Sequence, residues 1–199
     1  MAGFGAWESG RKKHSWPSSL EVIIVISGRP GSGKSAVASR VAEALGLRHV
    51  SAGDFMREIA AERGMSILEL SRLAEVDESI DRQIDARSAD LADKGGDFVM
   101  DARLGWYFVP QSFKVFLEVR PEVAAQRIYQ AARGTERENV DLETTREAIE
   151  ARTESETKRY RDYYGLDYAD HSHYDLVIDT SELGIDEVVA EILKNLPER

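Results

Sequence analysis

Hydrophobic positions along the chain fall into short apolar runs that alternate with longer segments of helical periodicity. Val22–Ile26 is uninterrupted and rich in β-branched residues, which is typical of a strand buried on both faces of a sheet. Weaker runs of the same kind follow at Phe98–Met100, Val115–Val119 and Leu176–Ile178. A shorter candidate strand lies at His49–Val50. Helical patterns fill the intervening segments, at Lys34–Leu45, Phe55–Arg63, Ser66–Ala74, Glu78–Lys94, Pro121–Ala132, Leu142–Tyr164 and Ile185–Leu196. Because strands alternate with helices, the pattern predicts an α/β fold with a parallel sheet covered on both faces.

Two helical segments are too long and too polar to be simple crossovers between neighbouring strands, namely Met56–Gly95 and Arg133–Asp170. We interpret them as inserted lobes that could close over a bound ligand. The predicted organisation is one domain over residues 21–199, with an insert at about 56–95 and a mobile lid at about 130–150. Residues 1–20 are expected to form a disordered arm, or alternatively to present a small basic patch at Arg11–His14.

Composition narrows the class of protein further. The 199 residues suffice for a single sizeable core, and the formal net charge of −10 argues against a general nucleic-acid-binding surface. The chain has no cysteine, which excludes disulfides and thiolate zinc sites and fits a reducing, cytoplasmic compartment. No apolar run approaches the ~20 residues needed to cross a bilayer. The leader MAGFGAWESGRKKHSWPSS lacks the apolar core of a secretory signal. We therefore expect neither nucleic acid nor membrane as a partner.

A glycine-rich turn after the first predicted strand carries the strongest chemical signal. It reads GRPGSGKS and matches G-x-x-x-x-G-K-[ST], with a strand before it and a helix after it. Its glycines let backbone N–H groups curl around phosphate oxygens, while Lys34 reaches the outer phosphates and the Ser35 hydroxyl binds magnesium directly. The alternative is a glycine turn that only joins strand to helix. The candidate phosphate-binding residues are Gly28, Arg29, Pro30, Gly31, Ser32, Gly33, Lys34, Ser35 and Ala36.

The rest of the chain distinguishes between classes of protein that use such a loop. A GTP switch needs an N-K-x-D segment, which is absent. A hydrolysing motor usually carries an acidic pair at the end of a second strand, whereas here Asp101 is followed by Ala102. Asp101 can hold a magnesium-bound water, but no second carboxylate follows it to activate water for hydrolysis. Phosphoryl transfer to an acceptor needs arginines and exclusion of water rather than such a base.

The chain supplies candidate arginines. Arg152 and Arg159 are seven residues apart on a predicted helix, so they lie within ~20° of each other on one face. We predict that both contact the transferring phosphoryl group and that Arg161, on another side, is a surface residue. Arg127 lies on the preceding helix and Arg133 in a predicted mobile loop. Each arginine alone could equally be a solvated charge.

The segment HVSAGDFMRE places a third candidate group at the start of the first insert. Arg57 is positioned to grip the phosphate of the acceptor, or it is a surface arginine paired with Glu58 or Glu62. Ser51 belongs to the same substrate-binding element. Asp54 either holds a magnesium-bound water or caps the helix that follows.

Together the glycine-rich loop, SAGDFMRE, DARLGW and KRYRDYYGLD resemble the nucleoside-monophosphate kinases, and most closely the short cytidylate kinases typical of archaea. The resemblance extends from about Val22 to Leu196. It implies that ATP and Mg²⁺ are the cofactors and that CMP or dCMP is the acceptor. AMP, UMP, a non-nucleotide metabolite, or a regulator that binds ATP without turnover are the alternatives.

The resemblance also implies roles for individual residues. Arg57 would hold the acceptor monophosphate with help from Arg103, and Arg127 would lie against the adenine of ATP. Arg133 would swing in with the lid, and it joins the catalytic group made up of Lys34, Arg133, Arg152 and Arg159. Nothing in the resemblance sets the oligomeric state beyond a monomer or weak oligomer.

The base of the acceptor must be read by the first insert. Cytosine offers an amino donor beside ring acceptors, and Asp81 and Asp85 lie one helical turn apart with Arg82 and Arg87 nearby. A solvated acidic helix face explains these residues equally well. Aromatic side chains that could stack on a base, or could belong to the core, are Phe55, Trp106 and Tyr107.

Overall fold

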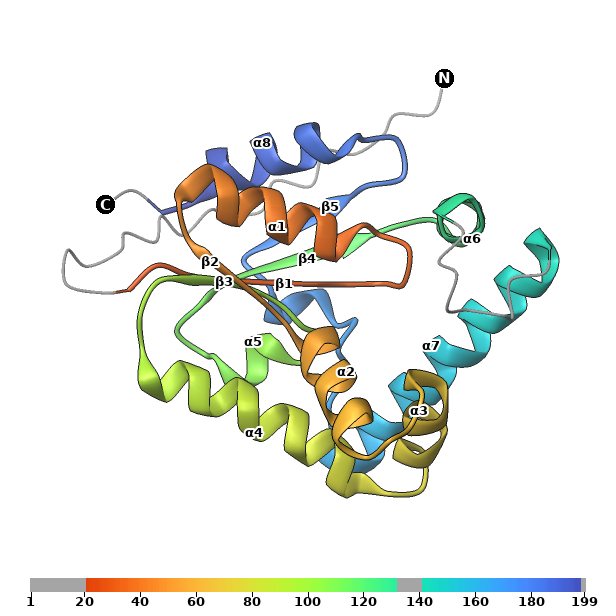
Figure 1. Ribbon diagram of the computed structural model, residues 1–199. Coiled ribbons are helices and arrows are strands. Elements are labelled where there is room, and N and C mark those ends of the chain that lie inside the picture. The colour runs from red at the N-terminus through yellow and green to blue at the C-terminus, as the bar shows by residue number, and fades with distance from the viewer. Residues whose placement is uncertain (1–20, 132–140, 198–199) are drawn as a thin grey trace.

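The computed structural model describes residues 21–131 and 141–197 (Figure 1). The predicted N-terminal arm and the lid residue Arg133 lie outside them. Five parallel strands form one sheet in the order β2-β3-β1-β4-β5, with β1 at Ile23–Gly28, β2 at Arg48–Ser51, β3 at Phe98–Asp101, β4 at Phe113–Glu118 and β5 at Leu176–Asp179. The predicted parallel α/β sheet is therefore confirmed.

The seven predicted helices are also present, within a few residues of the expected bounds. They are α1 at Lys34–Leu45, α2 at Ala52–Glu62, α3 at Ile67–Ala74, α4 at Glu78–Lys94, α6 at Pro121–Ala131, α7 at Leu142–Tyr164 and α8 at Ile185–Asn195. Two short elements were not predicted, the helix α5 at Gly105–Phe108 and a 3-10 turn at His171–His173. No helix in the described part of the chain is both long and apolar enough to cross a membrane.

Strand β1 lies at the centre of the sheet and is buried along its whole length. Its alternate side chains enter two different cores because successive residues of a strand point to opposite faces. Ile24 and Ile26 pack with residues of α1 and α8, whereas Ile23 and Val25 pack with Phe98 and other residues on the opposite face. Figure 1 shows α1 and α8 together on one side of the sheet and α4 and α5 on the other. This double coverage explains the unbroken apolar run in the sequence.

The carboxyl ends of three neighbouring strands meet at one edge of the sheet. Ser51 at the end of β2 is in register with Asp101 at the end of β3, and Asp101 is in register with Ile26, two residues before the glycine-rich loop. Open parallel sheets bind ligands at this edge. The topology therefore brings three of the predicted site segments together.

Helices α2, α3 and α4 form the insert, which has a small core of its own. That core contains Ile59, Leu70, Ala74 and Ile80, all buried. Arg87 of α4 donates to Glu58 and Glu62 of α2 and ties the two helices together across the surface. The insert is thus a separately packed lobe between β2 and β3.

Candidate active site

The glycine-rich loop adopts backbone conformations that need glycine at two positions for different reasons. Gly31 has φ 75°, and a Cβ built there would lie 2.8 Å from Ala124 of α6. Gly33 has φ 88° and stands at the N-cap of α1, with open space around it. No described side chain caps α1, so its first backbone N–H groups remain available for an anion. The loop has the form of a phosphate cradle.

Two side chains fix this loop to the neighbouring strands. The Arg29 Nε donates to the Glu118 carboxylate at the end of β4 (2.8 Å), and the other Glu118 oxygen lies 3.0 Å from His171 Nε2. Thr180, just after β5, lies with its hydroxyl 3.0 Å from the Glu118 carbonyl and 3.3 Å from the Ser32 carbonyl. Sequence reasoning missed Glu118, His171 and Thr180, because no motif marks them.

Arg127 of α6 also binds Thr180. It donates to the hydroxyl of Thr180 (3.1 Å) and to its carbonyl oxygen (2.6 Å). The predicted adenine neighbour therefore lies beside the loop that follows β5, close to the glycine-rich loop. Of the other loop residues, Pro30 and Ser32 are buried while Ser35 and Ala36 are exposed at the start of α1.

Lys34 lies within a cluster of charges at the carboxyl edge of the sheet. Burial and the positive charge of Arg103 lower its pKa to about 7, even though Asp101 and Glu156 act in the opposite direction. Arg152 also lowers this pKa. A bound anion would stabilise the charged form of Lys34 and so restore the charge of this lysine.

Asp101 is buried beside Lys34 and Ser35 at the end of β3. Burial alone would raise its pKa, but the His49, Lys34 and Ser35 side chains hold the pKa below its usual value. His49 Nε2 lies 3.5 Å from the Asp101 Oδ2 atom, which accepts no well-formed hydrogen bond from the described residues. Asp101 is thus an ionised, incompletely satisfied carboxylate next to the phosphate cradle.

These residues fit a magnesium ion that takes most of its ligands from water and phosphate. Among the described residues, no group of three or more His, Asp or Glu side chains could hold a metal by itself. A hydroxyl at Ser35 and the underused oxygen of Asp101 match a site completed by nucleotide phosphates instead. Asp54 lies in the first turn of α2, three residues after Ser51, which is in register with Asp101.

Glu156 of α7 joins two of the predicted arginines and was missed in the sequence. Its side chain is only 8% exposed. One carboxylate oxygen lies 2.7 Å from the Arg103 Nε atom, and the other accepts a hydrogen bond from the Arg152 Nε atom at 3.0 Å. The spacing of four residues between Arg152 and Glu156 was a possible signal. Nothing in the sequence connects Arg103 to that pair.

Arg159 makes a different contact from Arg152, although the two lie on the same helix face. Its Nε atom is 3.3 Å from Asp81 Oδ2 in α4, and both side chains are nearly buried. Four residues along α4, Asp85 accepts a hydrogen bond from Tyr164 of α7. Burial raises the pKa of Asp85 to about 7, helped by the nearby charge of Asp81. Asp81 and Asp85 therefore face α7 rather than forming a solvated acidic surface.

The start of α2 differs in detail from the prediction. The N-cap is Ser51, whose hydroxyl accepts from the Gly53 N–H (3.2 Å), so the alternative that Asp54 caps this helix is wrong. Asp54 instead pairs with Arg57, one turn later, and both side chains are more than half exposed. The alternative partners of Arg57, Glu58 and Glu62, are occupied by Arg87.

The aromatic candidates separate by exposure. Trp106 is buried and stacks on His173, with ring centroids 4.1 Å apart, so it belongs to the core. Tyr107 is 46% exposed and Phe55 is half-buried.

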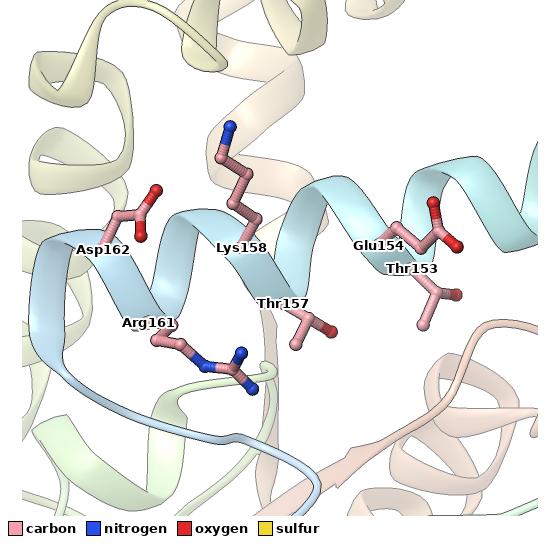
Figure 2. Close-up of a pocket in the computed structure, with 6 residues that line it drawn as sticks. All are labelled: Thr153, Glu154, Thr157, Lys158, Arg161 and Asp162. Carbon is pink, nitrogen blue, oxygen red and sulfur yellow. The ribbon is translucent and has the colours of Figure 1, made fainter.

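Arg161 is exposed, as predicted, and lines a shallow hollow of about 320 Å³ on the surface of α7. Figure 2 shows its side chain directed to the opposite side of the helix from Lys158.

The sequence of the chain is similar to those of known kinases. A sequence profile of the cytidylate kinase-like family matches residues 23–182. A cytidylate kinase of Natronomonas pharaonis is 40% identical over 173 residues, covering 86% of this chain and 87% of the relative. A cytidylate kinase of Methanothermobacter thermautotrophicus is 44% identical over 160 residues, covering 80% and 96%.

A solved structure gives independent support for the fold. Shikimate kinase from Bacteroides thetaiotaomicron superposes with a TM-score of 0.63 at 16% identity, covering 87% of this chain and 97% of that structure. At this identity the similarity supports the fold alone.

Proposed function

The chain belongs to the cytidylate kinase-like family, and from that membership we propose that it transfers the γ-phosphoryl group of ATP to CMP or dCMP. The observation that best supports this reaction is the gathering of Lys34, Arg103 and Arg152 beside the phosphate cradle. Arg103 and Arg152 balance the carboxylates Asp101 and Glu156, and Lys34 makes the site positive when it carries its proton. The relatives named cytidylate kinase support the choice of CMP as the acceptor.

On the ATP side, the backbone N–H groups at the start of α1 bind the β- and γ-phosphates, and Lys34 neutralises the charge that develops between them. Arg127, held by Thr180, lies against the adenine. The remaining loop residues, Gly28 to Ala36, shape the cradle. Ser35 would hold a magnesium ion directly and Asp101 would hold it through water, and the ion would neutralise charge on the phosphates.

On the acceptor side, Arg57, which lies exposed on α2 at the start of the insert, binds the phosphate of the monophosphate. Ser51 and Asp54 complete this element, with Asp54 exchanging its contact with Arg57 for a magnesium-bound water. Arg103 binds the acceptor phosphate from the core. An oxygen of that phosphate then attacks the γ-phosphorus in line, the bond to the bridging oxygen breaks, and ADP leaves.

The insert at about 56–95 selects the base. Asp81 accepts from the amino group of cytosine. Its partner Arg159 donates to the ring acceptors, since the two side chains already lie together. Arg159 would thereby serve the base, whereas the sequence alone suggested the transferring group. The hydrogen bond from Tyr164 to Asp85 supports this contact between α7 and α4.

A panel of acceptors tests the proposal directly. ADP release is measured with ATP and each of CMP, dCMP, UMP, AMP and a non-nucleotide phosphate acceptor. Release that depends on CMP or dCMP is the expected result. Turnover only with another acceptor would establish the same chemistry on a different substrate. ADP release that no acceptor increases, together with ATP binding, would indicate a regulator and refute the kinase.

A further inference from the structure

Glu156 is a buried carboxylate for which the reaction as described has no use. It lies on α7, where its side chain is 8% exposed. A buried charge is costly unless it is paired and hydrogen-bonded. Both oxygens of Glu156 are paired: one accepts a hydrogen bond from Arg152, and the other forms a close ion pair with Arg103 that lacks hydrogen-bond geometry. Those pairs hold its pKa below the usual value although burial would raise it, so the carboxylate is ionised.

The atoms used in these contacts are informative. Both arginines approach Glu156 through Nε, at 2.7 Å for Arg103 and 3.0 Å for Arg152. A guanidinium group carries four further N–H donors on its two Nη atoms. Glu156 therefore holds each guanidinium by its Nε edge, through a hydrogen bond from Arg152 and a close ion pair with Arg103. The Nη atoms of an arginine are the donors that can bind two phosphate oxygens at once.

We propose that Glu156 is a positioning residue that holds Arg103 and Arg152 in the orientation required for phosphoryl transfer. The inference rests on the proposed function. The two arginines come from different parts of the fold, Arg103 from the end of β3 and Arg152 from α7, and Glu156 is the group that they share. Without its negative charge, Lys34, Arg103 and Arg152 would repel one another. The half-exposed Arg152 side chain would then turn towards solvent.

This role predicts an unusual kinetic signature. Glu156 is itself negative, so removing its charge should leave the ground-state binding of ATP and CMP unchanged or slightly stronger. Transition-state stabilisation should fall, because the arginines are no longer held in place. Generalised damage to the site would instead weaken binding and turnover together.

The first experiment compares E156Q with E154Q in the full chain. Glu154 lies on the same helix, exposed at the surface hollow, and serves as the matched control. We expect E156Q to lower kcat by about 10²-fold without raising the KM of either nucleotide, on the scale of a misplacement of about 1 Å. E154Q should match the unmodified chain. An E156Q variant with unchanged kcat, or with KM raised in proportion to any loss of kcat, would overturn the proposal.

A double-mutant cycle shows whether Glu156 acts through an arginine. If it does, E156Q should cost much less kcat in an R152A background than in the unmodified chain, because part of what it positions is already absent. Equal losses in both backgrounds would refute the role. Should E156Q fail to fold, E156D keeps the charge but is too short to reach both Nε atoms, and the same split between kcat and KM is expected. An unmodified chain inactive with every acceptor would overturn the kinase itself, whereas an active chain indifferent to E156Q overturns only the positioning role.

Discussion

Raising the pH should weaken ATP binding to the ligand-free protein, and Lys34 is the group responsible. Its pKa is lowered to about 7 by burial and by Arg103. The charged form is the one that binds phosphate. About 90% of the lysine is charged at pH 6 but only about 10% at pH 8, so the apparent Kd should rise by roughly tenfold as the competent fraction falls. ATP binding above pH 7 should accordingly take up a proton.

Titration calorimetry in buffers of different ionisation enthalpy measures both quantities, the Kd and the proton uptake. The matched control is K34R, because arginine stays charged throughout this range. The ATP phosphates also titrate, but they are common to both proteins and cancel in the comparison. If the unmodified chain and K34R showed the same pH dependence of ATP affinity, the reasoning would be refuted.

The same lowered pKa has a consequence for stability. The fold penalises the charged lysine, and this penalty is complete below pH 7 and shrinks as the pH rises towards 10.5, where the unfolded lysine also loses its proton. K34M should therefore raise the Tm of the ligand-free protein most at low pH, while kcat falls by about 10²-fold or more. Near-normal kcat would exclude Lys34 from phosphate binding, and a lower Tm would make it a structural residue.

Three further substitutions probe other parts of the site. R57A should weaken the binding of CMP by tenfold or more and leave ATP affinity unchanged, as measured in separate calorimetric titrations. Equal losses of affinity for both nucleotides would exclude an acceptor site at Arg57. R159A should lower Tm and CMP affinity because it leaves Asp81 buried without its partner. R161A should match the unmodified chain, and similar effects of the two substitutions would contradict a role for Arg159 in binding the base. G31A should lower Tm and ATP affinity more than G33A. An alanine at either position is strained by the positive φ, but only at position 31 does its Cβ meet the backbone of α6. A larger loss of Tm in G33A than in G31A would refute that account.

The elements of this fold were largely predictable because their signals are local. The β-branched run of β1 and the 3.6-residue periodicity of α1, α4 and α7 depend on neighbours in the sequence. The two elements that were missed, α5 and the turn at His171–His173, are four and three residues long. Segments of that length cannot display a helical period.

The chemical groups of the site were only partly predictable. The glycine-rich loop and Asp101 were predictable because phosphate binding itself requires the spacing of residues in their motifs. Arg152 and Arg159 were correctly placed on one helix face, but seven residues separate them by about 10 Å along the axis. At that distance one face can meet two different parts of the protein, and α7 does so. Arg152 joins the core through Glu156, and Arg159 reaches the insert through Asp81.

The parallel sheet, the glycine-rich loop and the candidate arginines were all predictable, because each follows from a local pattern or a fixed spacing. The carboxylate that each arginine meets depends on long-range packing. Arg103 and Glu156 are far apart in the chain, and their pairing depends on the packing that brings α7 beside the segment that follows β3. Thr180 likewise meets Ser32 only because β5 and β1 end at the same edge of the sheet. Contacts of this kind are set by the packing of whole elements, for which no short stretch of sequence carries a signal.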